Sequence, residues 1–173
     1  MDYYIMPGGE AHCENDFPES LSFFFEQVGG YDDYAEVSQV SRILQIDLSV
    51  FQEISYDEDE EYYSPDDEDE EAEDSEDSPA IWHDTDAVIL VIDDLLAKIA
   101  AFPDYYKQVM HGPARQQNED FSLQMPDNKL LSGYPPDYGY LSKGEIIEDL
   151  KTLRKTLTCY EENGVYKFKF MYM

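Results

Sequence analysis

The residue types best suited to catalysis are scarce in this sequence. Three histidines are present, His12, His83 and His111, and nucleophilic catalysis needs one of them beside a serine or cysteine. His12 and Cys13 are sequence neighbours, whose side chains usually diverge, and no G-x-S-x-G nucleophile elbow occurs. A polar pocket around Trp82, His83 and His111 is the one arrangement that would favour an enzyme. We therefore expect no enzymatic activity and assign no catalytic residue.

Metal and cofactor motifs are also missing from the sequence. Two cysteines and three histidines without C-x-x-C or H-x-x-x-H spacing argue against structural zinc. An EF-hand loop needs a glycine, and the most acidic stretch contains none. Neither a phosphate-binding G-x-x-x-x-G-K-[ST] nor a dinucleotide-binding G-x-G-x-x-G appears. We expect neither a metal nor a cofactor.

The strongest signal is negative charge, and it is unevenly distributed. The 173 residues hold 40 acidic and 11 basic side chains, for a net charge of −29. Residues 98–173 are neutral, so the whole net charge lies before Lys98. Between Asp57 and Asp77, 15 of 21 positions are Asp or Glu. Solubility alone needs a net charge of only about 2–8 in magnitude. The excess therefore predicts a basic partner.

This charge excludes two classes of partner. Binding to a nucleic-acid backbone requires Lys and Arg to displace counterions, so we expect no direct nucleic-acid binding. Attachment to an anionic bilayer requires basic residues for the same reason, so we expect no membrane contact. A basic protein remains, and the oligomeric state stays open. The alternative for the acidic stretch is a solvated loop without a specific role.

Tyrosine is the second excess, with 15 residues, several of them among the acids. Tyrosine is enriched at protein interfaces and meets Lys and Arg through cation–π contacts. The alternative is that these tyrosines collapse onto the body of the protein. The predicted partner-binding residues are Tyr31, Asp32, Asp33, Tyr34, Asp57, Glu58, Asp59, Glu60, Glu61, Tyr62, Tyr63, Asp66, Asp67, Glu68, Asp69, Glu70 and Glu71.

The cysteines and the N-terminal residues indicate the cellular compartment of the protein. Cys13 and Cys159 are too few for a disulfide scaffold; they could pair, but we expect free thiols. The N-terminus lacks the basic and apolar regions of a signal peptide. The longest apolar run, Ala87 to Ile92, is far shorter than the ~20 residues of a membrane span. We expect a cytoplasmic protein.

Hydrophobic periodicity in the first half predicts a strand, a helix and a second strand. Residues 3–6 form a short aromatic strand that ends at Pro7. Residues 21–28 have helical spacing, with Ser20 as cap and Gly29-Gly30 as stop. Residues 44–50 alternate apolar and polar side chains, which predicts a half-buried strand. The acidic insertion then occupies residues 56–79.

The second half predicts two longer helices and a closing strand. A helix follows the Asp84-Thr85-Asp86 cap cluster and ends or bends at Pro103, and 111–140 reads as a long ordered loop. Ser142 and Glu145 form a capping box for a helix that stops at Asn163-Gly164. Residues 166–172 alternate as a strand. The fold class is therefore α+β: a single domain over 1–173 with two or three main helices on one small sheet.

The chain resembles the bacterial immunity proteins of polymorphic or contact-dependent toxins. The resemblance rests on the character of the whole chain, which is small, single-domain, acidic and poor in motifs; the nearest features are the acidic run Asp57–Asp77, the amphipathic helix Lys143–Glu162 and the strand Val165–Tyr172. It implies a small, acidic cytoplasmic inhibitor that neutralises a toxin with a cationic, nuclease-like active site by steric and electrostatic blocking. No functional residue can be carried over, because none of these features is a family-specific motif.

The runner-up is a DNA-mimic or histone-chaperone-like protein that competes for a nucleic-acid-binding surface. Duplex DNA carries one charge per ~1.7 Å of axis. A fully extended acidic run would carry one per ~4.7 Å, so mimicry requires the run to be compacted.

Overall fold

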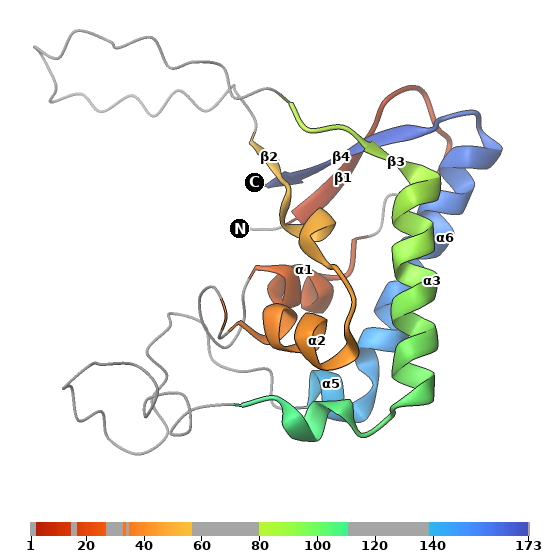
Figure 1. Cartoon of the computed structure of the whole chain (residues 1–173). Coiled ribbons are helices and arrows are strands. Elements are labelled where there is room, and N and C mark those ends of the chain that lie inside the picture. The colour runs from red at the N-terminus through yellow and green to blue at the C-terminus, as the bar shows by residue number, and fades with distance from the viewer. Residues whose placement is uncertain are drawn as a thin grey trace, which may run out of the picture.

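The centre of the fold is the strand β4 (Lys167–Tyr172), which pairs with each of the three other strands found among the described residues. The computed structural model describes residues 3–14, 17–26, 33, 35–56, 80–110 and 139–172. β1 (Tyr3–Pro7) is antiparallel to β4 along one edge. On the other edge β2 (Ser55–Tyr56) is parallel and β3 (His83–Asp84) antiparallel, and the two lie end to end (Figure 1).

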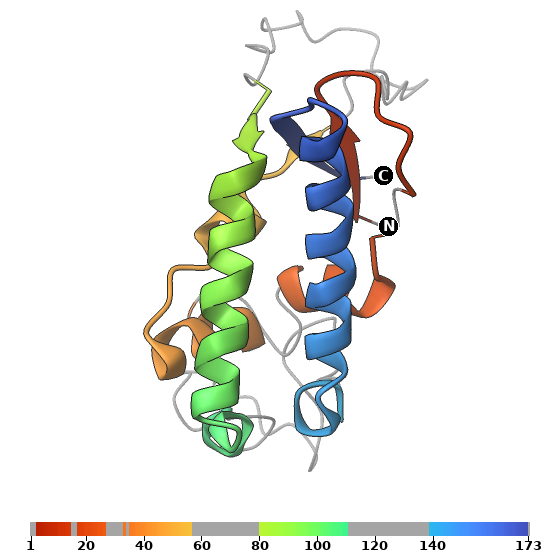
Figure 2. The same ribbon diagram turned by 90° about the vertical axis from the view of Figure 1, so that its right-hand side faces the viewer.

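Two long helices, α3 (Thr85–Ala101) and α6 (Glu145–Glu162), lie side by side and run in opposite directions (Figures 1 and 2). Apolar residues three, four or seven apart share one face of a helix, and these faces are buried between the helices and the core. The aliphatic residues of this pair that are fully or almost fully buried are Val88, Ile92, Leu95, Ile99, Ile146, Leu150, Leu153 and Leu157. The fold is α+β, and both predicted helices are confirmed.

Short elements complete the core beneath the sheet (Figure 1): α1 (Glu19–Phe25), α2 (Glu36–Leu44) and the 3₁₀ helices η2 (Ser49–Gln52) and η3 (Tyr105–Gln108). α5 (Tyr140–Lys143) precedes α6. The rings of Phe25 and Phe51 stack with centroids 4.2 Å apart, and Phe51 also meets Phe170 of β4 at 5.8 Å. These aromatic contacts join the short helices to the inner face of the sheet.

The predicted strand over residues 44–50 is wrong. Leu44 ends α2, Gln45 adopts a left-handed conformation with φ 52°, and the chain enters η2 at Ser49. Leu44, Ile46 and Leu48 are nevertheless buried and alternate with exposed neighbours, as the pattern predicted. The segment pairs with none of the described strands, and the Asp47 carboxylate instead accepts the Ser49 N–H at 2.9 Å, which starts the 3₁₀ turn.

Two predicted helix caps are also wrong. α6 starts after Gly144, with φ +76°, while Ser142 lies inside α5 and its hydroxyl donates to the Gly139 carbonyl. α1 starts after Pro18, so Ser20 lies within the helix. The predicted stop of α6 is confirmed, because Gly164 adopts φ +76° and the Val165 N–H bonds back to Tyr160.

Both predicted terminal strands are present, and several other predictions fall on residues that the structure does not describe. The predicted strand over 166–172 is confirmed as β4, and that over 3–6 as β1. Tyr56, the first residue of the predicted insertion, still belongs to β2, and 57–79 lies outside the described residues. The same holds for Val28 and Gly29-Gly30, and for 111–138 of the predicted ordered loop.

Candidate functional site

Only one of the predicted partner-binding residues, Asp33, falls among the described residues. Its side chain is 83% exposed and forms an ion pair of 3.8 Å with Arg42, whose guanidinium also donates to the Asp33 carbonyl oxygen. An exposed ion pair of this kind contributes little to stability. The others, which lie outside the described residues, are Tyr31, Asp32, Tyr34, Asp57, Glu58, Asp59, Glu60, Glu61, Tyr62, Tyr63, Asp66, Asp67, Glu68, Asp69, Glu70 and Glu71.

The structure does describe where the acidic segment 57–79 is attached. It follows β2, whose Tyr56 pairs with Tyr172, and it precedes Ala80 and β3, whose His83 pairs with Phe168. The Ile81 N–H also donates to the Ser55 hydroxyl at 2.9 Å. Both attachment points therefore lie along the same edge of β4, which we call the β2–β3 edge (residues 53–56 and 81–84).

The sheet has a buried inner face and a more open outer face. Ile5, His83, Phe168 and Phe170 point inward and are buried. Because side chains alternate along a strand, their neighbours point outward. Met6 pairs with Lys169, and the register of β3 places Trp82 on the far side of Lys169. This row of Met6, Lys169 and Trp82 defines the outer face.

Trp82 is the main feature of the outer face. Its side chain is 44% exposed, Met6 is 39% exposed, and the Lys169 ammonium lies 4.6 Å from the centre of the Trp82 ring. A Cβ atom at Gly8 would come within 3.0 Å of this ring and 2.9 Å of the Lys167 carbonyl oxygen. The absence of a side chain at Gly8 thus allows the indole of Trp82 to lie close to the backbone just after β1.

His83 has a structural role at the same edge. It is buried against Phe168 and Phe170, with ring centroids 5.8 and 5.2 Å away. Its Nε2 lies 3.0 Å from the Glu53 carbonyl oxygen and its Nδ1 lies 3.9 Å from the Glu53 carboxylate. Trp82 and His83 point to opposite faces of the sheet, so they do not line one pocket. His111 lies outside the described residues.

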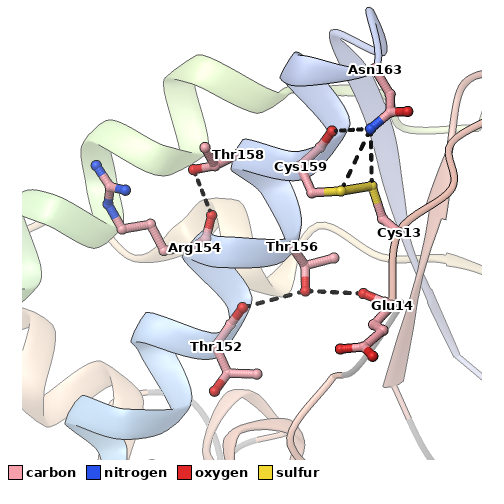
Figure 3. The surroundings of a disulfide bond; sticks show 8 residues. All are labelled: Cys13, Glu14, Thr152, Arg154, Thr156, Thr158, Cys159 and Asn163. Carbon is pink, nitrogen blue, oxygen red and sulfur yellow. Dashed lines mark hydrogen bonds between the residues drawn. A yellow bond between two sulfur atoms is a disulfide. The ribbon is translucent and has the colours of Figure 1, made fainter.

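Cys13 and Cys159 form a disulfide, and the expectation of free thiols is wrong (Figure 3). The chain after β1 runs along the C-terminal half of α6 and brings the two Cα atoms to 6.1 Å, within the range of a disulfide. The Asn163 amide lies 3.6 Å from both sulfur atoms and donates to the Cys159 carbonyl oxygen at 2.8 Å.

A pocket of about 240 Å³ adjoins this disulfide. Its lining residues are His12, Cys13, Glu14, Thr152, Lys155, Thr156 and Cys159. The Thr156 hydroxyl donates to the Glu14 carbonyl oxygen at 3.3 Å, which fixes the extended segment on the helix (Figure 3). The chemistry that this arrangement offers is the reversible opening of a disulfide that joins two distant parts of the chain.

Several charges of α3 and α6 form ion pairs with each other. Arg154 forms a bidentate ion pair with Asp93, at 2.6 and 3.0 Å, and its hydrogen bond lowers the pKa of the Asp93 carboxyl. Lys98 pairs with Asp94 and Lys151 with Glu148. Arg154 and Lys98 of the neutral C-terminal region are thus paired with acids of α3 that precede it.

Buried polar groups gather at the end of the helix pair opposite the sheet. Tyr140 donates to the Asp149 carboxylate at 2.9 Å, and burial raises the pKa of that carboxyl. Burial and the nearby Glu36 carboxylate raise the pKa of Tyr105 to about 12. The Gln39 side-chain amide bonds to both the N–H and the carbonyl oxygen of Met110, at 2.7 and 3.0 Å. These contacts hold the chain just before residue 111.

Sequence reasoning missed the outer face. The available signal was the position of the only tryptophan, immediately after the acidic run. The alternation of residues 166–172 predicted that Lys167 and Lys169 lie opposite Phe168 and Phe170, but it carried no information on which strands flank them. The cross-strand neighbours of Trp82 therefore became visible only in the fold.

Comparisons of the chain with protein-family models, with curated proteins and with solved structures give no match. Within the described ranges, His, Cys, Asp and Glu side chains form no group of three that could hold a metal ion. In the same part of the chain, no helix combines the length and apolar character needed to cross a membrane.

Proposed function

We propose that this protein is an acidic inhibitor, of the immunity-protein kind, that binds and neutralises a basic protein. The partner is a toxin with a cationic, nuclease-like active site, and inhibition is steric and electrostatic. Binding without catalysis is the activity proposed. The observation that carries the proposal is the separation of charge: all 29 net negative charges precede Lys98, and the 15 acids of 57–77 belong to one segment.

The ion pairs of α3 and α6 support this proposal. The bases Arg154, Lys98 and Lys151 already contact acids of these two helices, so the acidic segment is not required to neutralise them. The segment's own acids are matched by no base within 57–79. Like charges repel each other and oppose compaction, and a cationic partner would offset this cost.

Electrostatic steering gives the acidic segment a function that a neutral loop cannot have. Complementary fields raise association rates by about 10–10³-fold, and the gain decreases as salt increases. An inhibitor that protects a cell from a toxin has to bind before the toxin acts, so a high association rate is useful. Both ends of the segment lie at the β2–β3 edge, so a partner attracted by the segment would approach this part of the molecule.

The proposed compartment is the cytoplasm, where such a toxin would have its target. The Cys13–Cys159 disulfide opposes this assignment, because disulfides persist mainly in oxidising compartments. Alkylation of thiols in intact cells, followed by mass measurement, decides between the two. Two alkylated cysteines support the cytoplasm, and an unmodified disulfide places the protein in an oxidising compartment.

The proposal is tested by capture of the partner and reconstitution from purified proteins. The bait is the full chain, and the matched control replaces every Asp and Glu of 57–77 by Asn and Gln, which keeps length and shape. A basic protein that binds only the native chain at low salt and elutes as salt increases is then purified and assayed with and without the inhibitor.

For that purified pair, stopped-flow mixing should show an association rate about 10–10³-fold lower for the amide variant, with a much smaller change in dissociation. An unchanged association rate would contradict the steering role. A partner that has no enzymatic activity and is displaced equally well by duplex DNA would favour the DNA-mimic alternative.

A further inference from the structure

We propose that the outer face of the sheet docks an arginine side chain of the basic partner, with the guanidinium stacked on Trp82. The inference rests on the proposed function, which supplies a basic partner, and it adds where on the folded body that partner is held. The acidic segment would then govern association, and the outer face would govern how long the complex lasts.

The outer face is open at the row of Met6, Lys169 and Trp82, whereas Met171 on the same side of β4 is buried. Met6 on β1 and Trp82 just before β3 are each more than a third exposed, and they lie on either side of Lys169. The inner face of the same strands is covered by the core. Exposed apolar side chains that gather at one place on a protein mark an interaction surface more often than scattered ones.

The environment of Trp82 favours a cation. Lys169 already places its ammonium 4.6 Å from the ring, which shows that the geometry of this face brings positive charge to the indole. One carboxylate follows on the same side of β3 as Trp82, that of Asp84, whose side chain is 62% exposed. Its contact with Lys167 is long, 3.8 Å.

Arginine fits this combination better than lysine does. Its planar guanidinium can stack on an aromatic ring and at the same time present a fork of N–H donors to a carboxylate. A lysine ammonium is a strongly hydrated point charge that can make the cation–π contact without the stacked, bidentate geometry. We therefore expect the outer face to bind an arginine side chain more tightly than a lysine side chain of equal charge.

Charge argues against a second copy of this chain as the occupant. The two ends of the acidic segment, with its 15 carboxylates, are attached at the edge that borders this face. Two copies meeting through their outer faces would bring two such segments together, and their mutual repulsion would oppose the dimer. A basic partner gains from the same arrangement.

The experiment uses arginine and lysine homopeptides of equal length as probes, titrated into the full chain at ~0.15 M salt. Trp82 is the only tryptophan, so its fluorescence reports directly on this face. The arginine peptide should change the emission of Trp82 at saturation more than the lysine peptide does. Calorimetry then gives the affinities of variants that lack the indole.

Trp82→Ala should lower affinity for the arginine peptide about three- to tenfold and for the lysine peptide less than twofold. The matched control is Phe102→Ala, which removes an exposed ring beyond the C-terminus of α3, about 25 Å of helix away from β3. The control should change both affinities less than twofold. Circular dichroism and the thermal midpoint establish that each variant folds.

A second pair of variants tests the inference even if the Trp82→Ala variant does not fold. Lys169→Met and Lys151→Met make the same change in charge, but only Lys169 lies over the indole. Because Lys169 occupies the ring, its removal should raise affinity for the arginine peptide at least twofold more than the Lys151 change does. Equal effects of the two lysine variants would overturn the inference.

Equal losses of arginine and lysine affinity in Trp82→Ala would also overturn it, and the proposed function would then still stand on the acidic segment. If the arginine preference depends on Trp82 but no basic partner is captured, the proposed function fails and the arginine-binding face stands. The two failures are therefore distinguishable.

Discussion

The two ends of the α3–α6 pair differ in the side chains that lie beside their long connections. At the sheet end, Trp82 and Asp84 are exposed beside the attachment points of the acidic segment. At the far end, Gln39, Tyr105 and Tyr140 are buried beside the points where the chain enters and leaves residues 111–138. Each end therefore carries one long connection, but the chemistry at its base differs.

This difference separates groups that specify the fold from groups that can bind. A buried polar group destabilises the fold unless it is hydrogen-bonded, because its loss of water is otherwise uncompensated. Gln39 meets this need with two bonds to Met110 and thereby fixes the chain before residue 111. Trp82 and Asp84 remain accessible to another molecule. Side chains at the far end thus fix the long connection to the core, whereas those at the sheet end remain available to bind another molecule.

The largest expected effect is on the sheet end, where the disulfide joins the chain after β1 to α6. The double variant Cys13→Ser, Cys159→Ser should lower the free energy of unfolding by about 2–5 kcal/mol, because the bond closes a loop with a sequence separation of 146. Urea denaturation measures this. The native chain in excess reductant is the control and should match the variant. Equal free energies of unfolding for the oxidised and the reduced protein would show that the disulfide does not stabilise the sheet end.

The next effect concerns the far end. Gln39→Ala removes both side-chain hydrogen bonds to Met110 and should cost about 2–3 kcal/mol, since two backbone groups lose their partners. Gln52→Ala, at an exposed position of η2, is the control and should change stability by less than about 0.5 kcal/mol. A comparable small effect at Gln39 would remove the contrast between the two ends.

The parts of the fold that sequence predicted well are those in which local pattern and burial agree. In α6 the inward positions Ile146, Leu150 and Leu157 recur at helical spacing, Gly164 supplies the left-handed stop, and all three apolar side chains are fully buried. The strand β4 follows directly and buries Phe168 and its alternate neighbours. For α6 the local pattern is sufficient, and for β4 the pairing with β1, β2 and β3 agrees with the local pattern.

Residues 36–52 show the limit of the same reasoning. The alternation of Leu44, Ile46 and Leu48 correctly predicted which side chains are buried. It did not predict conformation, because a strand also needs a neighbouring strand, and the described sheet offers none here. The helical spacing of Val37, Val40 and Leu44 was the competing signal and proved decisive. Burial pattern and secondary structure are separate predictions.

The candidate site depended most on contacts between distant residues. The disulfide joins residues 146 apart, and no local pattern encodes that proximity. Trp82 gains its place on the outer face from the register of β3 against β4. The acidic and tyrosine-rich residues chosen from composition stay predictions, since only Asp33 lies in the described part of the chain.

The smallest effects compare two buried tyrosines at the far end. Tyr140→Phe removes the hydrogen bond to Asp149 and should lower the free energy of unfolding by about 1 kcal/mol. Tyr105→Phe should raise it by about 1 kcal/mol, because the Tyr105 hydroxyl is buried without a hydrogen-bond partner among the described residues. Urea denaturation at neutral pH measures both. Effects of the same sign would contradict the hydrogen bonding described for this end.

Alkaline pH should widen the difference between Tyr105→Phe and the native protein. The pKa of Tyr105 increases from 10.0 to about 12 on folding, mainly by burial and partly by the Glu36 carboxylate. Below pH 10 the phenol is protonated in both the folded and the unfolded chain. Between pH 10 and about 12 the unfolded chain ionises while the folded protein keeps the proton, so the free energy of unfolding of the native protein decreases. Phenylalanine cannot ionise, so the variant escapes this loss. The gap in unfolding free energy between variant and native protein should grow between pH 10 and 12, whereas a constant gap would mean that the phenol of Tyr105 meets solvent.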